Sequence, residues 1–309
     1  MAVNMGSSYF VSAVPSLSPP LNYRSCTPTN SAGLRNSQFV TQRRVLMEAT
    51  KRDVMHHDKQ LEEEEHMLAA AGLRAEAMPK HVAVITDGHR RWARQRGHPV
   101  EYGHRTLEPV NAELCRLCCK FGIKVLTIYL FSTETWLRSQ EETDSLMSLF
   151  EEAIRSNLEE SIKHDIRISV IGDRTRLPQS LIEVINEAEE KTRAKSRLHL
   201  ILGIGYGGQN DVIQACKKVF KKVKDGSIRE EEINEKIFEQ ELQTSICTEN
   251  PFPDLLIRAA GELRLSNFYL YQAAYAELYF TKAPYPDFKE EDMVMALKSY
   301  QQRRRRYGR

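Results

Sequence analysis

Short runs of β-branched and apolar residues alternate with longer segments of helical periodicity from Pro79 to the C-terminus. Six of the short runs predict β-strands, at residues 81–86, 124–130, 166–171, 198–203, 254–258 and 276–280. Six of the longer segments predict helices, at residues 107–121, 144–164, 181–193, 211–224, 231–243 and 290–306. Because strands alternate with helices and are apolar on both faces, the pattern favours an α/β fold with a mostly parallel sheet surrounded by helices.

The first 47 residues differ in composition from the rest of the chain. They contain no Asp or Glu, their basic residues are all arginines, and Ser and Thr are frequent among them. This composition is typical of a mitochondrial or chloroplast transit peptide, and the many hydroxyl groups favour the plastid (chloroplast). Pro15, Pro19 and Pro20 interrupt the apolar run that a secretory signal would need. A simple disordered tail is the alternative.

The chain after this leader divides into two parts. Residues 48–77, which include four consecutive glutamates at positions 62–65, predict a charged helical linker. Residues 78–309 remain for a single folded domain. In parallel sheets of this kind, ligands bind beyond the carboxyl ends of the strands, so the loops there are the place to look for chemistry.

The composition excludes several classes of protein. Lys and Arg total 44 and Asp and Glu total 42, a net charge of +2, which is too balanced for a protein that binds nucleic acid in bulk. No apolar run approaches the roughly 20 residues that a transmembrane helix needs. Six cysteines in 309 residues do not make a disulfide scaffold.

Two motifs suggest sites that their surroundings do not support. Residues 203–208 read Gly-Ile-Gly-Tyr-Gly-Gly, a literal G-x-G-x-x-G between a predicted strand and a predicted helix. A dinucleotide site also needs a following strand that ends in an acid, and none is predicted there. We expect these glycines to hold an anion at the helix N-terminus instead. Cys115, Cys118 and Cys119 share one predicted helix without further zinc ligands, so we interpret them as buried thiols.

The loop after the first predicted strand carries stronger chemistry. Residues 86–93 read Thr-Asp-Gly-His-Arg-Arg-Trp-Ala. Asp87 can hold Mg²⁺, which bridges phosphate oxygens, and Arg91 can bind those oxygens through two guanidinium nitrogens. The loop is therefore typical of a site for a metal-bound polyphosphate, although a capped helix start with a solvated charged face would have the same sequence.

Two further loops add a second anion site. Residues 131–138 follow the second predicted strand and read Phe-Ser-Thr-Glu-Thr-Trp-Leu-Arg, and residues 258–268 follow the fifth. Arg258, Arg264 and Ser266 form a second anion clamp that needs no metal. Two phosphate-binding halves without a P-loop indicate condensation of two diphosphates rather than nucleotide hydrolysis.

Residues 79–309, about three quarters of the chain, resemble the cis-prenyltransferases, the family of undecaprenyl and dehydrodolichyl diphosphate synthases. The resemblance rests on stretches that occur in the same order, at residues 81–92, 103–104, 131–136, 172–173, 206–208, 258–268 and 274–280. It implies a parallel six-stranded sheet with helices around an apolar tunnel, a homodimer, and one catalytic domain over residues 78–309.

The resemblance also implies roles for the matching residues. Asp87 matches the aspartate that binds Mg²⁺ and diphosphate, and Glu277 matches a glutamate that supports metal and phosphate binding. Arg258, Arg264 and Ser266 match the clamp on the second substrate. The other substrate-binding residues that the resemblance implies are Gly88, Arg91, Trp92, His104, Ser132, Trp136, Arg138, Arg306 and Gly308. The last two belong to a tail that, in the family, reaches the site of the partner subunit.

The chain departs from the family pattern beside the reacting carbons. The family has Asn at the positions of His89 and Thr135, where the two asparagines help to orient the second substrate. Further departures are Gln209, Ala259, Ala260 and Leu263. Drift or loss of activity would explain such changes, but the aspartate and the arginines of both clamps are retained. We therefore expect an active enzyme in which Asp87, His89 and Thr135 are catalytic and the second-substrate chemistry is altered.

The predicted reaction is a Mg²⁺-dependent condensation of two C5 diphosphates. Replacement of both asparagines favours two dimethylallyl diphosphates joined head to middle, which gives lavandulyl diphosphate. Regular cis condensation with isopentenyl diphosphate, to neryl diphosphate or a longer product, is the alternative. Leu130 occupies a position that faces the tunnel in this family, and its bulk favours a C10 product. A nicotinamide-dependent oxidoreductase and a catalytically silent partner subunit are alternatives from other classes.

Overall fold

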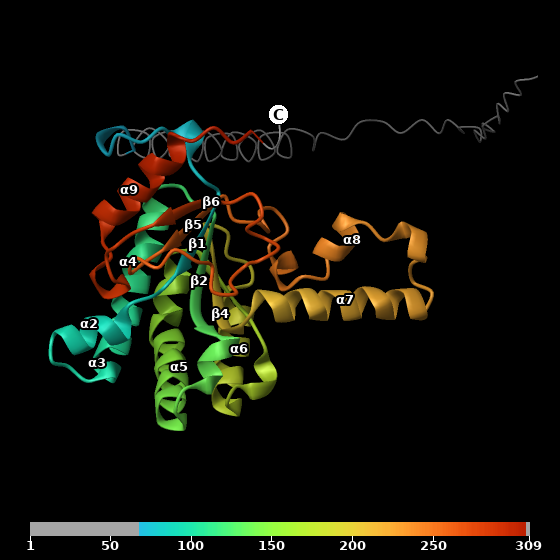
Figure 1. The fold of residues 1–309 in the computed structure, drawn as a ribbon, viewed down its shortest axis with the longest axis horizontal. Coiled ribbons are helices and arrows are strands. Elements are labelled where there is room, and N and C mark those ends of the chain that lie inside the picture. The colour runs from blue at the N-terminus through green and yellow to red at the C-terminus, as the bar shows by residue number, and fades with distance from the viewer. Residues whose placement is uncertain (1–67, 307–309) are drawn as a thin grey trace, which may run out of the picture. The chain divides into compact units, whose positions relative to one another are not determined.

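The computed structural model describes residues 68–306, in which six strands form one parallel sheet (Figure 1). The order across the sheet is β3-β4-β2-β1-β5-β6. The strands are β1 (His81–Ile85), β2 (Val125–Ser132), β3 (Ile166–Ile171), β4 (Leu198–Tyr206), β5 (Leu255–Arg258) and β6 (Glu277–Phe280). Every pairing between neighbours is parallel, so all the strands end at the same edge of the sheet. This confirms the predicted fold class.

Helices lie in the connections between the strands, except in the loop from β5 to β6. The α-helices are α2 (His89–Gln95), α3 (Val100–Arg105), α4 (Leu107–Lys120), α5 (Gln140–Lys163), α6 (Gln179–Thr192), α7 (Gly208–Lys224), α8 (Glu235–Glu239) and α9 (Glu290–Gln301). Short 3₁₀ turns are η1 (Ala75–Ala77), η2 (Thr133–Leu137), η3 (Arg174–Arg176), η4 (Glu230–Glu232), η5 (Gln243–Ile246) and η6 (Tyr285–Asp287).

Two of the predicted helices differ from the structure. The helix predicted over 231–243 is wrong, because the structure has only the short α8 as an α-helix in this segment. Asn234 begins α8 as its N-cap, since its side chain accepts the Ile237 N–H at 3.1 Å. The helix predicted over 290–306 ends at Gln301. Four consecutive arginines follow it, and their mutual repulsion opposes a further helical turn. The helices α2 and α3 were not predicted.

The two faces of the sheet are covered differently. Along β1, Val82 and Val84 pack into a core with α4, α5, α6 and α9, whereas Ala83 and Ile85 face the opposite side. There Phe268 and Tyr269, from the loop after β5, are fully buried against the sheet. This loop therefore covers one face of the sheet and also leads from the end of β5 to the start of β6.

An apolar cavity of about 650 Å³ lies between α4, α5 and the strands β2 to β4. Leu130 and Ile204 line it near the carboxyl ends of their strands, and His164 and Arg197 line it just before β3 and β4 begin. The cavity thus runs along the strands, as expected of an apolar tunnel. Cys115 and Cys118 on α4 are buried free thiols, as predicted, whereas Cys119 is only partly buried.

The predicted leader and most of the predicted linker lie outside the described residues. The end of the linker segment is part of the folded body, because Leu68 and Leu73 are buried in the core. Among residues 68–306, no helix has the length and apolar character needed to cross a bilayer.

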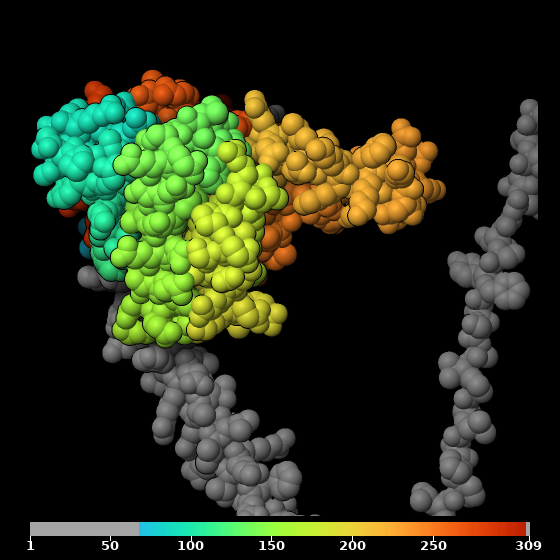
Figure 2. Space-filling model, turned by 90° about the horizontal axis from the view of Figure 1, so that it is seen from below, coloured from blue at the N-terminus to red at the C-terminus, as the bar shows by residue number. Residues whose placement is uncertain are grey.

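The helices α7 and α8 extend away from the rest of the described chain, as Figure 2 shows. Ile213, Cys216 and Phe220 follow one another at intervals of three and four residues on α7, so they share one face. All three side chains are exposed. This apolar face has no partner within residues 68–306.

Acid should destabilise the fold through His81, which is fully buried at the start of β1. Its ring nitrogens bind Asn250 O at 2.9 Å and Thr127 Oγ1 at 2.8 Å, and burial lowers its pKa from 6.5 to about 4. Between these two values the unfolded chain binds a proton that the folded chain does not, so stability falls as the pH falls. Urea denaturation should show that His81 contributes a loss of about 2 kcal/mol between pH 7 and pH 5.

The matched comparison is His81→Gln, which removes the titrating group. Its free energy of unfolding should depend less on pH by about the same amount. An unchanged pH dependence in the variant would contradict this role of His81.

Candidate active site

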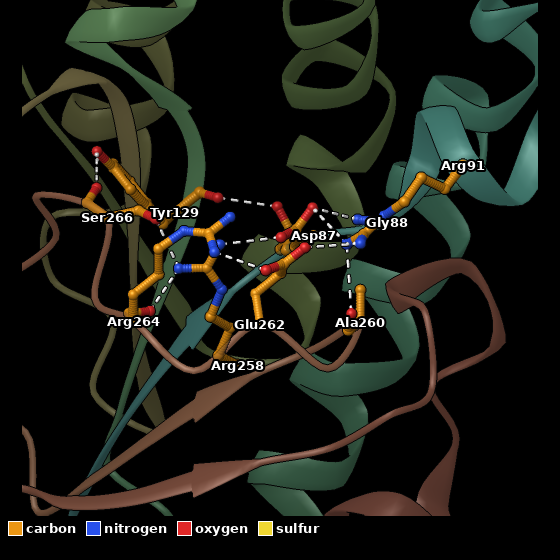
Figure 3. Close-up of polar contacts among 10 residues, drawn as sticks. Asp87, Gly88, Arg91, Tyr129, Arg258, Ala260, Glu262, Arg264 and Ser266 are labelled. Carbon is orange, nitrogen blue, oxygen red and sulfur yellow. Dashed lines mark hydrogen bonds and ion pairs between the residues drawn. The ribbon is translucent and has the colours of Figure 1, made fainter.

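The site lies where β1 and β5 end side by side at the carboxyl edge of the sheet (Figure 3). Ile85, the last residue of β1, is aligned with Arg258, the last residue of β5, and Asp87 follows shortly after. This alignment brings Arg258 Nη2 to 3.0 Å from Asp87 Oδ2. The Arg258 side chain is only 4% exposed and the Asp87 side chain 31%, so an ion pair with a nearly buried guanidinium forms the centre of the site.

Arg258 also holds the loop that follows β5. Its Nη1 donates to Ser266 Oγ at 2.6 Å and to the carbonyl oxygen of Arg264. The side chain of Arg264 points elsewhere and binds Glu262 at 2.6 Å. Of the predicted second clamp, the structure therefore joins Arg258 and Ser266 directly and leaves the Arg264 guanidinium at the exposed rim.

Gly88 makes the turn that presents Asp87. Its φ of 106° lies in the left-handed region, and a Cβ there would be 2.9 Å from the Cβ atoms of Ala260 and Pro284. The Gly88 N–H donates to Asp87 Oδ1 at 2.6 Å. One oxygen of Asp87 is thus held by the backbone and the other by Arg258.

Arg91, in the first turn of α2, contacts the same group of residues. Its guanidinium lies 3.6 Å from Asp87 Oδ1 and 2.7 Å from Glu262 Oε1. Because Glu262 also binds Arg264, one carboxylate joins the arginines of both predicted clamps (Figure 3). Hydrogen bonds from Arg264 and Arg91 lower the pKa of Glu262. The sequence reasoning missed Glu262, although an acid between two arginines in a site loop is a usable signal.

A pair of buried histidines lies close by. The ring centroids of His89 and His104 are 6.2 Å apart. Burial lowers the pKa of His89 to about 3, and the positive charges of His104 and Arg138 add to this shift. Burial also lowers the pKa of His104, against the opposing effect of Glu142. Both imidazoles are therefore neutral near pH 7.

Glu142, in the first turn of α5, gathers basic side chains around this pair. Its Oε1 lies 2.9 Å from Arg138 Nη1, 3.7 Å from His104 Nε2 and 3.8 Å from Arg90 Nε. The sequence reasoning missed Glu142. An acid in the first turn of a helix is common because it interacts favourably with the helix dipole, so it does not by itself indicate a site. Two arginines on one carboxylate leave an excess of positive charge near His89.

Several buried polar atoms of the site have no hydrogen-bond partner within the described chain. They are His89 Nε2, Arg90 Nε, His104 Nδ1, Trp136 Nε1 and Arg258 Nε. An unsatisfied buried group costs about 1–3 kcal/mol, and more when it is charged. Since all of these atoms belong to basic or N–H-bearing side chains, the site is suited to an anion with several acceptor oxygens, such as a diphosphate.

Ser132 and Thr135 form a reciprocal cap where β2 passes into η2. The Ser132 N–H donates to Thr135 Oγ1 at 3.2 Å, the Thr135 N–H donates to Ser132 Oγ at 3.2 Å, and the two hydroxyls are 3.0 Å apart. The next residue, Trp136, packs edge to face on Phe131, with ring centroids 4.6 Å apart. The Thr135 hydroxyl is thus engaged locally by Ser132.

Trp92 makes contacts of a structural kind. Its Nε1–H donates to Asp287 Oδ1 at 2.8 Å, and the guanidinium of Arg96 lies 4.4 Å from its ring centroid. These contacts fasten α2 to η6 and occupy the only polar atom of the side chain.

The structure does not bring Glu277 to Asp87. Glu277 is aligned with Leu255 and Leu255 with Val82, near the amino ends of their strands. Ile85, the last residue of β1, lies three residues beyond Val82, which is about 10 Å along the strand at about 3.3 Å per residue, and Asp87 follows after Ile85. Glu277 binds Arg303 instead, at 2.9 Å. One metal ion shared by both carboxylates within one chain is therefore excluded.

The predicted C-terminal tail also lies away from this chain's own Asp87. Arg305 binds Asp254, which directly precedes β5 and lies at the opposite end of that strand from Arg258. Arg306 is exposed, and Gly308 lies outside the described residues. A role for this tail or for Glu277 in catalysis would therefore require a partner subunit.

Two amides of the glycine-rich turn before α7 already have a partner within the protein. The Gly208 N–H donates to Asn267 O at 2.6 Å, and the Gln209 N–H donates to Asn267 Oδ1 at 2.9 Å. Asn267, from the loop after β5, thus occupies two of the donors on which the predicted anion site depends. No strand directly follows α7 in the described chain, which agrees with the rejection of a dinucleotide site.

The residues present fit Mg²⁺ bound through a substrate. Among residues 68–306, no group of three or more His, Cys, Asp or Glu side chains could form a metal site made of protein alone. Mg²⁺ commonly needs only one or two carboxylates, together with substrate phosphates and water. Asp87, which is 31% exposed beside the arginines, meets this requirement.

Comparisons with known proteins agree with this geometry. A family model described as "Putative undecaprenyl diphosphate synthase" matches residues 85–308. Dehydrodolichyl diphosphate synthase 2 of Arabidopsis thaliana is 51% identical over 236 residues, which cover 76% of each chain. A (2Z,6Z)-farnesyl diphosphate synthase of Solanum lycopersicum, described as chloroplastic, is 50% identical over 76% of this chain and 80% of its own.

A solved structure also matches. It is lavandulyl diphosphate synthase from Lavandula x intermedia in complex with dimethylallyl diphosphate, which is 44% identical with a TM-score of 0.74. The match covers 76% of this chain and 100% of that one.

Replacing Arg258 by Lys should weaken binding of inorganic pyrophosphate at least tenfold, as measured by isothermal titration calorimetry with Mg²⁺. A lysine cannot bind Asp87, Ser266 and a phosphate oxygen in the fixed planar arrangement that a guanidinium allows. The control is Arg155→Lys, on an arginine bound to Glu151 on the surface of α5. Equal affinity in Arg258→Lys and wild type would contradict the role of Arg258.

Proposed function

The chain belongs to the undecaprenyl diphosphate synthase family and is a prenyltransferase, and on this premise we propose that it joins two C5 diphosphates into a C10 product. We infer further that both C5 units are dimethylallyl diphosphate and that their head-to-middle coupling gives lavandulyl diphosphate. This inference rests on the two positions where the family has Asn and this chain has a buried neutral His89 and a locally bonded Thr135.

The two replacements change what the site offers to a second substrate. An Asn amide both donates and accepts hydrogen bonds. Thr135 offers a hydroxyl that Ser132 already engages, and His89 offers one ring nitrogen without a partner in the described chain. The arginines that bind diphosphate remain in place. This combination supports a second substrate that keeps its diphosphate but carries its double bond at a different position.

The proposed reaction begins when the C1–O bond of one dimethylallyl diphosphate breaks and pyrophosphate leaves. Arg91, His104 and Arg138 stabilise the negative charge that develops on the leaving group. C2 of the second dimethylallyl diphosphate then attacks C1 of the allylic cation through its double bond, which leaves the positive charge on C3 of the second unit. Loss of a proton from a methyl group on C3 gives the branched product.

His89 is suited to bind the leaving diphosphate by a hydrogen bond. With a pKa of about 3 before substrate binds, its imidazole is a weak base and a poor acceptor for the final proton. A diphosphate oxygen beside the ring would raise that pKa and accept a hydrogen bond from it. We therefore assign the final proton to the released pyrophosphate.

Asp87 is the residue that would hold Mg²⁺. The ion, when bound, neutralises charge on the diphosphate oxygens. The Gly88 N–H and Arg258 fix the orientation of the carboxylate by one bond to each oxygen, at 2.6 Å and 3.0 Å. The carboxylate is thus oriented before substrate arrives.

Regular cis condensation is the second candidate, because the cavity is large. At about 30 Å³ for each water-sized atom, a cavity of about 650 Å³ holds roughly twenty such atoms. This exceeds the ten carbons of a C10 product and would accommodate neryl diphosphate or a longer chain. Leu130, at the end of the cavity nearer the site, is the residue whose bulk would limit such growth.

We propose that the enzyme is a homodimer. The exposed face of α7, with Ile213, Cys216 and Phe220, is an apolar surface of the kind that a second copy covers. Glu277 lies far from Asp87 in its own chain, so a role at the site would need a second copy of the chain.

We also propose that the protein works in plastids after removal of a leader within residues 1–47. The acid-free, arginine- and serine-rich composition supports this proposal. Several relatives are described as chloroplastic.

Dimethylallyl diphosphate supplied alone with Mg²⁺ should yield lavandulol after dephosphorylation, as detected by gas chromatography and mass spectrometry. Asp87→Ala is the inactive control, and size-exclusion chromatography should show that its oligomeric state is unchanged. C10 products that appear only when isopentenyl diphosphate is added would contradict head-to-middle coupling and support regular condensation.

Leu130→Ala should allow products longer than C10 when isopentenyl diphosphate is the second substrate, because the smaller side chain opens the cavity. The measurement is the chain-length distribution of dephosphorylated products. A matched control is Leu149→Ala, which also enlarges the cavity but on α5. An unaltered distribution in Leu130→Ala would count against its control of length.

A further inference from the structure

We propose that Asn267 is a positioning residue for the second substrate: seated against Gly207 and Gly208, it holds the Ser266 hydroxyl on Arg258. This inference rests on the proposed function, because it takes Arg258 and Ser266 as the clamp for the second diphosphate. It also gives the glycine-rich turn before α7 a role that neither nucleotide nor anion binding provides.

Asn267 connects three segments that are distant in the sequence. Its backbone oxygen accepts the Gly208 N–H at 2.6 Å, and its Oδ1 accepts the Gln209 N–H at 2.9 Å. Its Nδ2 donates to Glu134 Oε1 at 2.7 Å. These bonds fasten the loop after β5 both to the start of α7 and to η2, which contains Thr135.

The backbone at this point needs such support. Ser266 has a φ of 49° and Asn267 a φ of 62°, so two consecutive residues with side chains are left-handed. This conformation is unfavourable for residues with a Cβ, although Asn tolerates it better than most. It persists where surrounding contacts hold it. The result is that Ser266 Oγ lies 2.6 Å from Arg258 Nη1.

The two glycines make room for this arrangement. A Cβ at Gly207 would lie 2.5 Å from Thr133 Oγ1 and 2.9 Å from Asn267 Nδ2. A Cβ at Gly208 would lie 2.9 Å from Leu270 Cγ. Gly207 itself has an extended backbone, so an alanine there keeps the backbone conformation and crowds the side chains of Thr133 and Asn267.

The arrangement predicts which kinetic constant depends on Asn267. The residue touches no reacting atom, and its bonds determine where Ser266 and Arg258 meet. Removing the hydrogen bonds of Asn267 should weaken binding of the second diphosphate, while kcat at saturating substrate changes little. Purely structural damage would lower both together.

The probe is isopentenyl diphosphate, titrated by calorimetry with Mg²⁺. It carries the same diphosphate that the clamp would bind in a second dimethylallyl diphosphate, but it cannot form an allylic cation. Asn267→Ala should raise its Kd about tenfold, which is about 1.4 kcal/mol, while kcat on saturating C5 substrates falls less than threefold. Asn267→Asp keeps the acceptor for Gln209 but repels Glu134, and should show an intermediate rise. Asn267→Gly relieves the left-handed backbone but removes the side chain, so its Kd should rise like that of Asn267→Ala.

Two further variants test whether the effect runs through Ser266. Gly207→Ala should reproduce the rise in Kd without changing Asn267. In a Ser266→Ala background, Asn267→Ala should add little, because the hydroxyl that it positions is already gone. The control is Asn234→Ala, which removes a comparable helix cap at α8 and should leave Kd unchanged.

The outcomes separate this inference from the proposed function. Wild-type protein that binds no C5 diphosphate would overturn the proposed function. Wild-type protein that binds, together with an unchanged Kd in Asn267→Ala or wild-type affinity in Asn267→Gly, would overturn the positioning role alone. Additive effects of Asn267→Ala and Ser266→Ala would overturn it as well.

Discussion

The ion pair between Asp87 and Arg258 is the contact on which the rest of the site depends. Its partners are 171 residues apart in sequence and meet only because β1 and β5 are neighbours in a parallel sheet. A guanidinium that is almost buried is costly unless it is paired and hydrogen-bonded. The pair therefore offsets the cost of burying the guanidinium and places a carboxylate suited to a metal beside an arginine suited to a phosphate. Gly88 and Ser266 hold the two partners from either side.

Around this pair, the basic side chains of the site rest on carboxylates of the protein itself. Glu262 holds Arg91 and Arg264, and Glu142 holds Arg138 and His104. The Glu262 pairs lie at exposed arginines, and exposed ion pairs are worth about 0–1 kcal/mol, so a diphosphate with more charge and more acceptor oxygens can displace Glu262 at small cost. The buried nitrogens without partners in the described chain add to the gain on binding. The free protein thus keeps its arginines close to the positions in which a diphosphate would need them.

The hydrophobic pattern predicted the strands well, because buried strands are continuous apolar runs; β3 begins and ends as predicted. It missed α2, which is short and has only two buried residues, and its periodicity is too weak to detect. Asp87 and Arg258 were predictable because the loops that follow parallel strands all lie at one edge of the sheet. Glu142 and Asn267 were not, because their contacts join segments whose proximity only the fold determines. Glu277 was predicted from a matching motif, but the structure places it away from Asp87. A motif does not show at which edge of the sheet, or in which subunit, its residue acts.

The cavity is larger than a C10 product requires, and the chemistry of coupling resolves this difference. In head-to-middle coupling, proton loss places the new double bond between C3 and its methyl carbon, one bond too far from C1 for an allylic diphosphate. Such a product cannot ionise to a stabilised cation, so growth ends after one condensation whatever the volume of the cavity. A regular product such as neryl diphosphate stays allylic and can be extended, and then the bulk of Leu130 at the near end of the cavity would have to stop it. Product length is therefore controlled by bond position in the first case and by steric volume in the second.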